Sequence, residues 1–271
     1  LKAALGDKTR LIVAKGADID SQDTAGFADA VAAAKQADAV VMFLGEHPDM
    51  SAEANNRTSL DLPGVQEQLA LAVAATGKPV ALVLLNGRPL SIGRLKGKVQ
   101  AILEAWFPGV EGGPAIADVL FGDVNPSAKL PVTFPHNVGQ VPIYYAHKNT
   151  GRPPSEQEKY TSKYLDVPWT PLYAFGHGLS YTTFRYDAPV VSKKTRVASA
   201  LQQQVSVRLT NTGKRAGEEV VQLYVRDDVA SVTRPVRQLR GFQRVALQPG
   251  ESKVVTFTLG FDDLAMLDDR M

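Results

Sequence analysis

Val80-Ala81-Leu82-Val83-Leu84-Leu85 is a continuous apolar run with a turn sequence on either side. Aliphatic runs of similar length lie at residues 11–15, 39–44 and 99–103. Runs that are apolar throughout, without alternation, are typical of parallel strands that are buried on both faces of a sheet. We therefore predict four such strands in the first half of the chain.

Two helical patterns lie between these runs. Residues 25–36 place Phe27, Val31 and Ala34 on one face, and residues 63–76 do the same with Val65, Leu69, Ala72 and Val73. Proline at the first position and Gly77 at the end are the expected boundary residues of the second helix. The order of strands and helices predicts a doubly wound α/β sandwich domain with right-handed crossovers.

The pattern changes twice further along the chain. From about residue 122 to residue 184 the sequence is rich in Pro and Gly and has little periodicity, which predicts a connector that packs across another surface. From residue 185 apolar residues alternate with polar ones, and turn signals at 211–213 and 248–251 separate the runs. We expect residues 1–184 to form the α/β domain with its connector, and residues 185–271 a fibronectin type III-like, immunoglobulin-like β-sandwich.

Composition excludes several classes of protein. The chain has 271 residues, 30 basic and 28 acidic, and a formal charge of +2, so no strong field favours nucleic acid or an anionic membrane. It has no cysteine, which excludes disulfides and thiol catalysis. No apolar run reaches the roughly 18 residues of a membrane span, and the first residues do not read as a signal peptide. We expect no membrane insertion, and we expect a further amino-terminal region before Leu1.

The densest polar cluster directly follows the run at 39–44. The loop at 45–58 contains Glu46, His47, Asp49, Glu53 and Arg57. In open α/β sheets the loops beyond the carboxyl ends of the strands form the ligand crevice, so this loop lies where a substrate is expected. An equally acceptable reading is a solvated loop whose charges pair locally.

Several motifs are spread over the whole chain. The first is Gly45-Glu46 followed by SAEANNR at 51–57. The other segments are LDLPGVQ at 60–66, VLLNGRP at 83–89, AWFPGVEGG at 105–113, ADVLFGDVNPSAKLP at 117–131, FGHGLSY at 175–181, and, in the last domain, LTNTG at 209–213, LRGF at 239–242 and LQPGES at 247–252. Together these motifs resemble the family three glycoside hydrolases, and among them the bacterial periplasmic β-glucosidases.

The resemblance implies an activity and assigns roles. It implies a retaining, exo-acting β-glucosidase that removes terminal non-reducing β-D-glucosyl residues, with Glu53 as the general acid/base and the nucleophilic Asp in an amino-terminal barrel domain. Ser51, Arg57, Asp49 and Glu46 are then candidates for supporting or substrate-binding roles. The implied partners are a β-glucoside or oligosaccharide substrate and that barrel, and the implied location is periplasmic or secreted. In this family Gly often follows the acid/base, whereas this chain has Ala54.

Other readings of the same residues stay open. Arg57 is expected to hold its own loop through Glu46 or Asp49 more often than to touch substrate. His47 has no second His nearby, so we predict no metal site and no cofactor. The sequence contains no Gly-x-Ser-x-Gly elbow, which argues against an α/β-hydrolase triad. The main alternative is a non-catalytic carbohydrate-binding or scaffolding fragment, and in either case we expect the isolated chain to be inactive.

Overall fold

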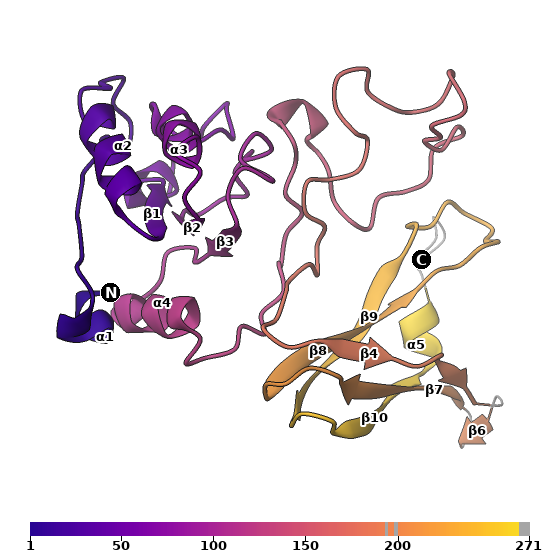
Figure 1. The fold of residues 1–271 in the computed structure, drawn as a ribbon. Coiled ribbons are helices and arrows are strands. Elements are labelled where there is room, and N and C mark those ends of the chain that lie inside the picture. The colour runs from indigo at the N-terminus through magenta and orange to yellow at the C-terminus, as the bar shows by residue number, and fades with distance from the viewer. Residues whose placement is uncertain (193–194, 198–199, 266–271) are drawn as a thin grey trace. The chain divides into compact units, whose positions relative to one another are not determined.

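The computed structural model describes residues 1–192, 195–197 and 200–265, and it divides into two compact units (Figure 1). Each unit is assembled from three segments of the chain. The first unit consists of Leu1–Leu120, Phe134–Ile143 and Asp166–Tyr173. The second consists of Phe121–Thr133, Tyr144–Leu165 and Ala174–Met271.

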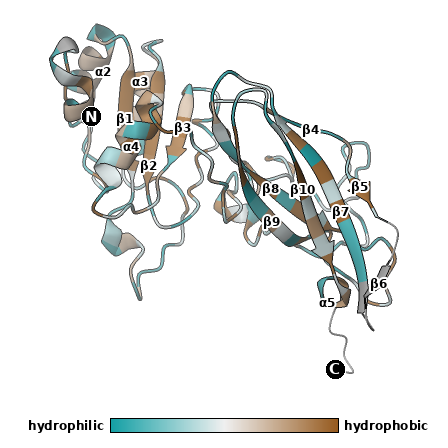
Figure 2. Cartoon of the chain, turned by 90° about the horizontal axis from the view of Figure 1, so that it is seen from below, coloured by the Kyte–Doolittle hydropathy of each residue, from teal (hydrophilic) through white to brown (hydrophobic). Residues whose placement is uncertain are grey.

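The first unit is built on a parallel sheet of three strands in the order β1-β2-β3. The strands are β1 (Val40–Gly45), β2 (Val80–Leu85) and β3 (Ala101–Glu104). Leu82, Val83 and Leu84 of β2 are fully buried, as a central strand covered on both faces requires. Figure 2 shows β1 and β2 as hydrophobic almost throughout. The continuous apolar character of the sequence thus corresponds to the buried sheet that it predicted.

This unit also contains helices. They are α1 (Lys2–Leu5), α2 (Phe27–Gln36), α3 (Gln66–Ala74) and α4 (Gly112–Phe121), with short 3-10 turns η1 (Gly6–Lys8), η2 (Pro48–Met50) and η3 (Val138–Gln140). Leu69 and Val73 of α3 and Ala34 of α2 lie in the same apolar cluster as the buried residues of β1 and β2. The first unit is therefore an α/β domain.

One buried amide joins α3 to the end of β1. The Gln66 side chain accepts a hydrogen bond from the Gly45 amide at 2.8 Å and donates to the carbonyls of Gly45 and Ile19, both at 2.7 Å. The residue is almost completely buried. It satisfies main-chain groups that a strand leaves unpaired where it ends.

The strand that we predicted at residues 11–15 is wrong. Residues 11–15 belong to no strand, although the structure describes every one of them. Val13 is 82% exposed and Leu11 is 43% exposed. An apolar run becomes a strand only where a neighbouring strand pairs with its main chain, and no strand of the described part of the chain pairs with this one.

The second unit contains a fibronectin type III-like β-sandwich. Strand β7 (Ala200–Asn211) pairs antiparallel with β10 (Ser252–Leu259), β4 (Phe184–Tyr186), β5 (Val190–Val191) and β6 (Thr195–Val197). Strands β8 (Gly217–Val225) and β9 (Gln238–Leu247) form a second sheet, and the short helix α5 (Phe261–Leu264) follows β10. Buried residues of both sheets form one apolar core, with one residue from each of β7, β8, β9 and β10: Leu209, Val221, Leu247 and Val255.

The expected connector contributes to both units. Residues 121–133 belong to the second unit, where Asn125 donates to the carbonyl of Ala216 at 2.9 Å and Lys129 pairs with Glu219 at 3.1 Å. Residues 134–143 and 166–173 belong to the first, where Phe134 is buried against Trp106 and Tyr173. A domain boundary between residues 184 and 185 remains a prediction. No helix in the described ranges is long and apolar enough to cross a membrane.

Candidate functional site

Polar residues meet at the carboxyl ends of the three parallel strands. Glu46 directly follows β1, Asn86 directly follows β2, and Glu104 is the last residue of β3. Register places Gly45 beside Leu85 and Leu84 beside Glu104, so the three strands end at neighbouring levels. This edge is where open α/β sheets bind ligands.

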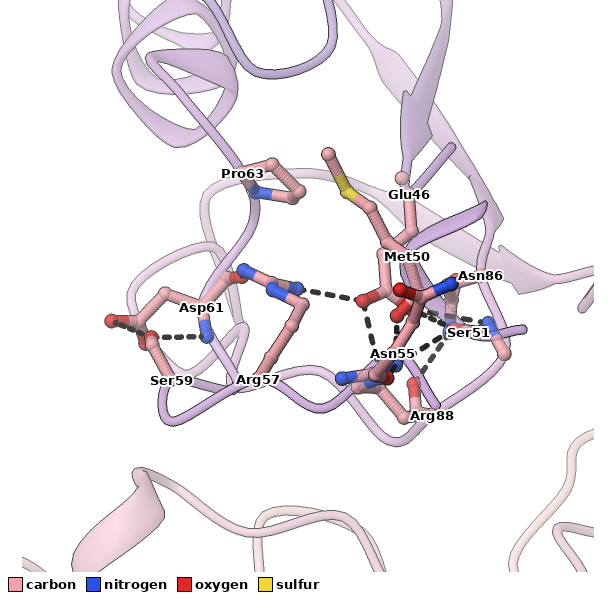
Figure 3. A network of polar contacts seen from close by, with 12 residues as sticks. Glu46, Met50, Ser51, Asn55, Arg57, Ser59, Asp61, Pro63, Asn86 and Arg88 are labelled. Atoms are coloured by element: carbon pink, nitrogen blue, oxygen red, sulfur yellow. Dashed lines mark hydrogen bonds and ion pairs between the residues drawn. The ribbon is translucent and has the colours of Figure 1, made fainter. Parts of the chain in front are cut away.

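Glu46 is the centre of a network of charged hydrogen bonds (Figure 3). Its side chain is fully buried, and one carboxylate oxygen lies 2.7 Å from Nη1 of Arg57 and 3.2 Å from Nε of Arg88. The other oxygen accepts from Ser51 Oγ at 3.0 Å and from the Gly87 amide at 3.2 Å. A buried carboxylate needs such partners, because an unpaired charge away from water is very costly. Glu46 is therefore a structural anchor of the loop.

Arg88 extends the network from the turn after β2 to the loop after β1. Besides Glu46, its guanidinium donates to the carbonyl of Met50 and to Ser51 Oγ, the latter at 3.1 Å. The approach is close: a Cβ at Gly87 would lie 2.6 Å from Cβ of Ser51 and 2.9 Å from Phe107. Only glycine fits between the loop and Phe107. Arg57 fixes the other end of the loop, because it also donates to the carbonyl of Asp61 at 2.8 Å.

Glu53 lies in the part of the loop between these anchors, and it is exposed. No hydrogen bond or ion pair joins its carboxylate to another residue in the described part of the chain. The next residue, Ala54, has φ of 63°, a left-handed conformation that glycine adopts far more easily than alanine. The backbone thus takes a tight turn directly after Glu53.

Asp49 lies apart from the Glu46 network. It belongs to η2 and its side chain is 84% exposed, with the carboxylate 3.2 Å from Nδ1 of His47. The structure therefore brings Glu46, Ser51 and Arg57 together and leaves Asp49 and Glu53 facing solvent. Among the residues that the structure describes, no group of three or more His, Asp or Glu could hold a metal ion.

Glu104 is a further carboxyl group at this edge, which the sequence analysis missed. Burial raises the pKa of Glu104 to about 7; the hydrogen bond from the Trp106 amide and the nearby Asn86 side chain oppose this increase, and the charge of Glu46 adds to it. Arg88 and Asn86 were also missed as site residues. Their position at the carboxyl end of a parallel strand, or in the turn that follows it, is the signal that could have identified all three.

The chain matches the description "Glycosyl hydrolase family 3 C-terminal domain" over residues 2–181 and "Fibronectin type III-like domain" over residues 219–271. This chain belongs to glycosyl hydrolase family 3. It is 46% identical to a periplasmic beta-glucosidase of Salmonella typhimurium and 47% identical to a beta-xylosidase of Formosa agariphila, and both matches cover all of this chain. The chain spans 38% and 37% of the lengths of these two proteins.

Solved structures of this hydrolase family agree with the fold. A beta-glucosidase from Listeria innocua, solved with laminaribiose, superposes with a TM-score of 0.86 at 40% identity. The match covers 94% of this chain and 35% of that protein. The family 3 chain thus corresponds to about a third of the Listeria innocua protein, and it has the α/β sandwich and the fibronectin type III-like domain of the family.

Proposed function

We propose that this family 3 chain is part of a retaining, exo-acting β-glucosidase and supplies its general acid/base, Glu53. In a retaining mechanism two carboxyl groups lie about 5 Å apart on either side of the glycosidic bond. One attacks the anomeric carbon, and the other gives a proton to the leaving oxygen and later removes one from water. Glu53 is assigned the second role.

The observation that carries this assignment is the difference between the carboxylates of the loop. Glu46 is buried, and its carboxylate pairs with two guanidinium groups and accepts hydrogen bonds from a hydroxyl and a main-chain amide. Both of its oxygens therefore already have partners. Asp49 is paired with His47. Glu53 is exposed on a loop whose two ends are fixed, and it has no partner in the described part of the chain. A group that exchanges a proton with substrate must be free in this way and yet held in place.

The remaining parts of the site are assigned to an amino-terminal barrel domain. It would provide the nucleophilic Asp and most of the groups that bind the terminal glucosyl unit. A general acid also keeps its proton only where apolar surroundings or a nearby carboxylate disfavour the charged form, and we assign that environment to the barrel as well. A periplasmic or secreted location is part of the same proposal, since one relative is named for the periplasm.

The test is Glu53→Ala in an enzyme that carries this chain together with the barrel. An activated aryl leaving group departs without a proton, whereas an alkyl leaving group needs one. We expect kcat/KM for an alkyl β-glucoside to fall by about 10²–10⁴-fold and that for a dinitrophenyl β-glucoside to fall much less. Azide, which needs no general base, should partly restore turnover of the aryl substrate.

Asp49→Ala is the matched control, because it removes the other exposed carboxylate of the same loop. We expect it to change neither the ratio between the two substrates nor the response to azide. Equal, small effects of Glu53→Ala on both substrates would overturn the assignment. They would favour the alternative, in which this chain binds or presents carbohydrate without taking part in the reaction.

A further inference from the structure

Two carboxyl groups of the sheet edge lie in opposite electrostatic environments. Glu46 is held between Arg57 and Arg88, which compensate its charge. Glu104 lies close enough to feel the charge of Glu46, and no cation of the described residues is within ion-pair distance of it. Two neighbouring carboxyl groups with such different surroundings cannot both be ionised at similar cost.

Two buried oxygen atoms at this edge, one on Glu104 and one on Asn86, accept no hydrogen bond in the described structure. One carboxyl oxygen, Oε1, accepts from the Trp106 amide at 3.1 Å, while Oε2 is buried and has no partner in the described structure. Asn86, at the end of the next strand, is fully buried and also has an acceptor oxygen without a donor. Its Nδ2 donates to the carbonyl of Arg88 at 2.8 Å, but its Oδ1 has no donor. Two buried acceptors without a donor are unusual, and one proton would satisfy both.

We propose that Glu104 is a positioning residue that keeps its proton in the folded chain and donates it from Oε2 to the Asn86 amide oxygen, fixing the ends of β2 and β3. Its raised pKa of about 7 agrees with this role but is not the ground for it. The part of the proposal that concerns the proton is independent of the proposed function. The part that concerns catalysis rests on it, since it assigns Glu104 an effect on the loop of Glu53.

Glu104 stands between two turns that shape this loop. On one side Asn86 begins the turn that carries Gly87 and Arg88, which bind Glu46 and the loop main chain. On the other side the Trp106 amide bound to Glu104 belongs to a residue with φ of 53°, a strained conformation for tryptophan that needs support. Phe107, next in sequence, lies against Gly87. Loss of the Glu104 proton would therefore remove the proposed donor to Asn86 and release the turn after β2, while the hydrogen bond from the Trp106 amide remains.

The expected dependence on pH has a definite sign. The pKa of Glu104 is raised on folding, so between about pH 4.5 and pH 7 the folded chain holds a proton that the unfolded chain has lost. Stability contributed by this group is thus present at low pH and is lost as the pH rises to about 7. Glu104→Gln, which has a permanent donor in the same place, should not show this loss.

The first test uses the 271-residue chain itself. The carboxyl ¹³C signal of Glu104, assigned by its absence in Glu104→Gln, should titrate near pH 7. Between pH 5 and pH 8 the urea midpoint of the wild-type chain should fall relative to that of Glu104→Gln. Glu111→Gln, a change at an exposed glutamate, should follow the wild type. Titration of Glu104 near pH 4.5, or parallel midpoints of wild type and Glu104→Gln, would overturn the proposal.

The second test uses the enzyme that contains the barrel. Glu104→Gln should retain kcat/KM at pH 6 within about 3-fold and lose less activity than the wild type between pH 6 and pH 8, whereas Glu104→Leu, which has no donor, should lose about 10-fold or more. Equal pH profiles of wild type and Glu104→Gln would contradict the catalytic part. Because the titration and the urea midpoints require no activity, failure of the proposed function alone would leave their outcome unchanged.

Discussion

At the scale of single residues, the loop after β1 contains one carboxylate that holds the structure and another that faces solvent. Glu46 is buried with Arg57 and Arg88, and Glu53 is exposed a few residues later. Removing one member of a buried ionic network typically costs about 3–5 kcal/mol because it leaves uncompensated charge. Loss of activity on mutation of Glu46 would thus report on folding of the loop as much as on chemistry.

The turn after Glu53 gives a prediction that concerns one residue. Ala54 is left-handed at φ of 63°, so Ala54→Gly should stabilise the chain by about 1 kcal/mol by removing the clash of Cβ with the main chain. The measurement is urea unfolding of the two chains at one pH.

Ala52→Gly is the matched control, because Ala52 is exposed in the same loop and does not have positive φ. Ala52→Gly should lower the free energy of unfolding by up to about 1 kcal/mol, because glycine only adds conformational freedom to the unfolded chain. If the two variants shift the free energy of unfolding in the same direction, the left-handed strain at Ala54 is not real.

At the scale of elements, the apolar runs of the sequence correctly predicted the three strands of the parallel sheet. The run at residues 80–85 is β2, and those at 39–44 and 99–103 contain most of β1 and β3. The run at 11–15 failed, because pairing with a neighbour is not encoded in the apolar pattern of the strand itself. Glu104 was missed for a related reason: Asn86 and Glu104 become neighbours only when β2 and β3 pair.

The contact between α3 and β1 gives a prediction at the same scale. Gln66→Leu would leave the amide of Gly45 and the carbonyls of Gly45 and Ile19 without their partner. The amide and carbonyl of Gly45 are buried, and a buried main-chain group left unpaired costs about 1–3 kcal/mol, so we expect the free energy of unfolding to fall by roughly 2–6 kcal/mol. Thermal unfolding followed by circular dichroism would measure it.

Gln68→Leu makes the same chemical change on the exposed side of α3. We expect it to alter stability by no more than about 0.5 kcal/mol. A comparable loss in both variants would mean that leucine is poorly tolerated in this helix for a reason other than the buried amide.

At the scale of the whole molecule, the motifs of the sequence identified the family and both kinds of domain. They could not identify which charged groups pair, since that depends on which strands end side by side. The catalytic proposal also extends beyond this chain, which spans 38% of its Salmonella typhimurium relative. A retaining mechanism needs two carboxyl groups on opposite sides of one bond, and we have assigned only one of them here.

This gives a prediction for the chain as a whole. The 271-residue chain alone should not hydrolyse 4-nitrophenyl β-D-glucoside above the rate in buffer, because the proposed nucleophile is not among its assigned residues. Release of nitrophenol at high chain concentration is the measurement, with Glu53→Ala as the control for contamination. Turnover that the wild-type chain shows and Glu53→Ala lacks would place the entire reaction within these residues.

The division into two units has a consequence for how such a chain can change over evolution. Three segments of each unit alternate along the sequence, so the backbone passes between the units five times. A single break in the gene, at residue 184 for example, would separate segment 174–184 from the remainder of the unit to which it belongs. Recombination can therefore not exchange one unit for a foreign one in a single crossover, and the two units are expected to be inherited together.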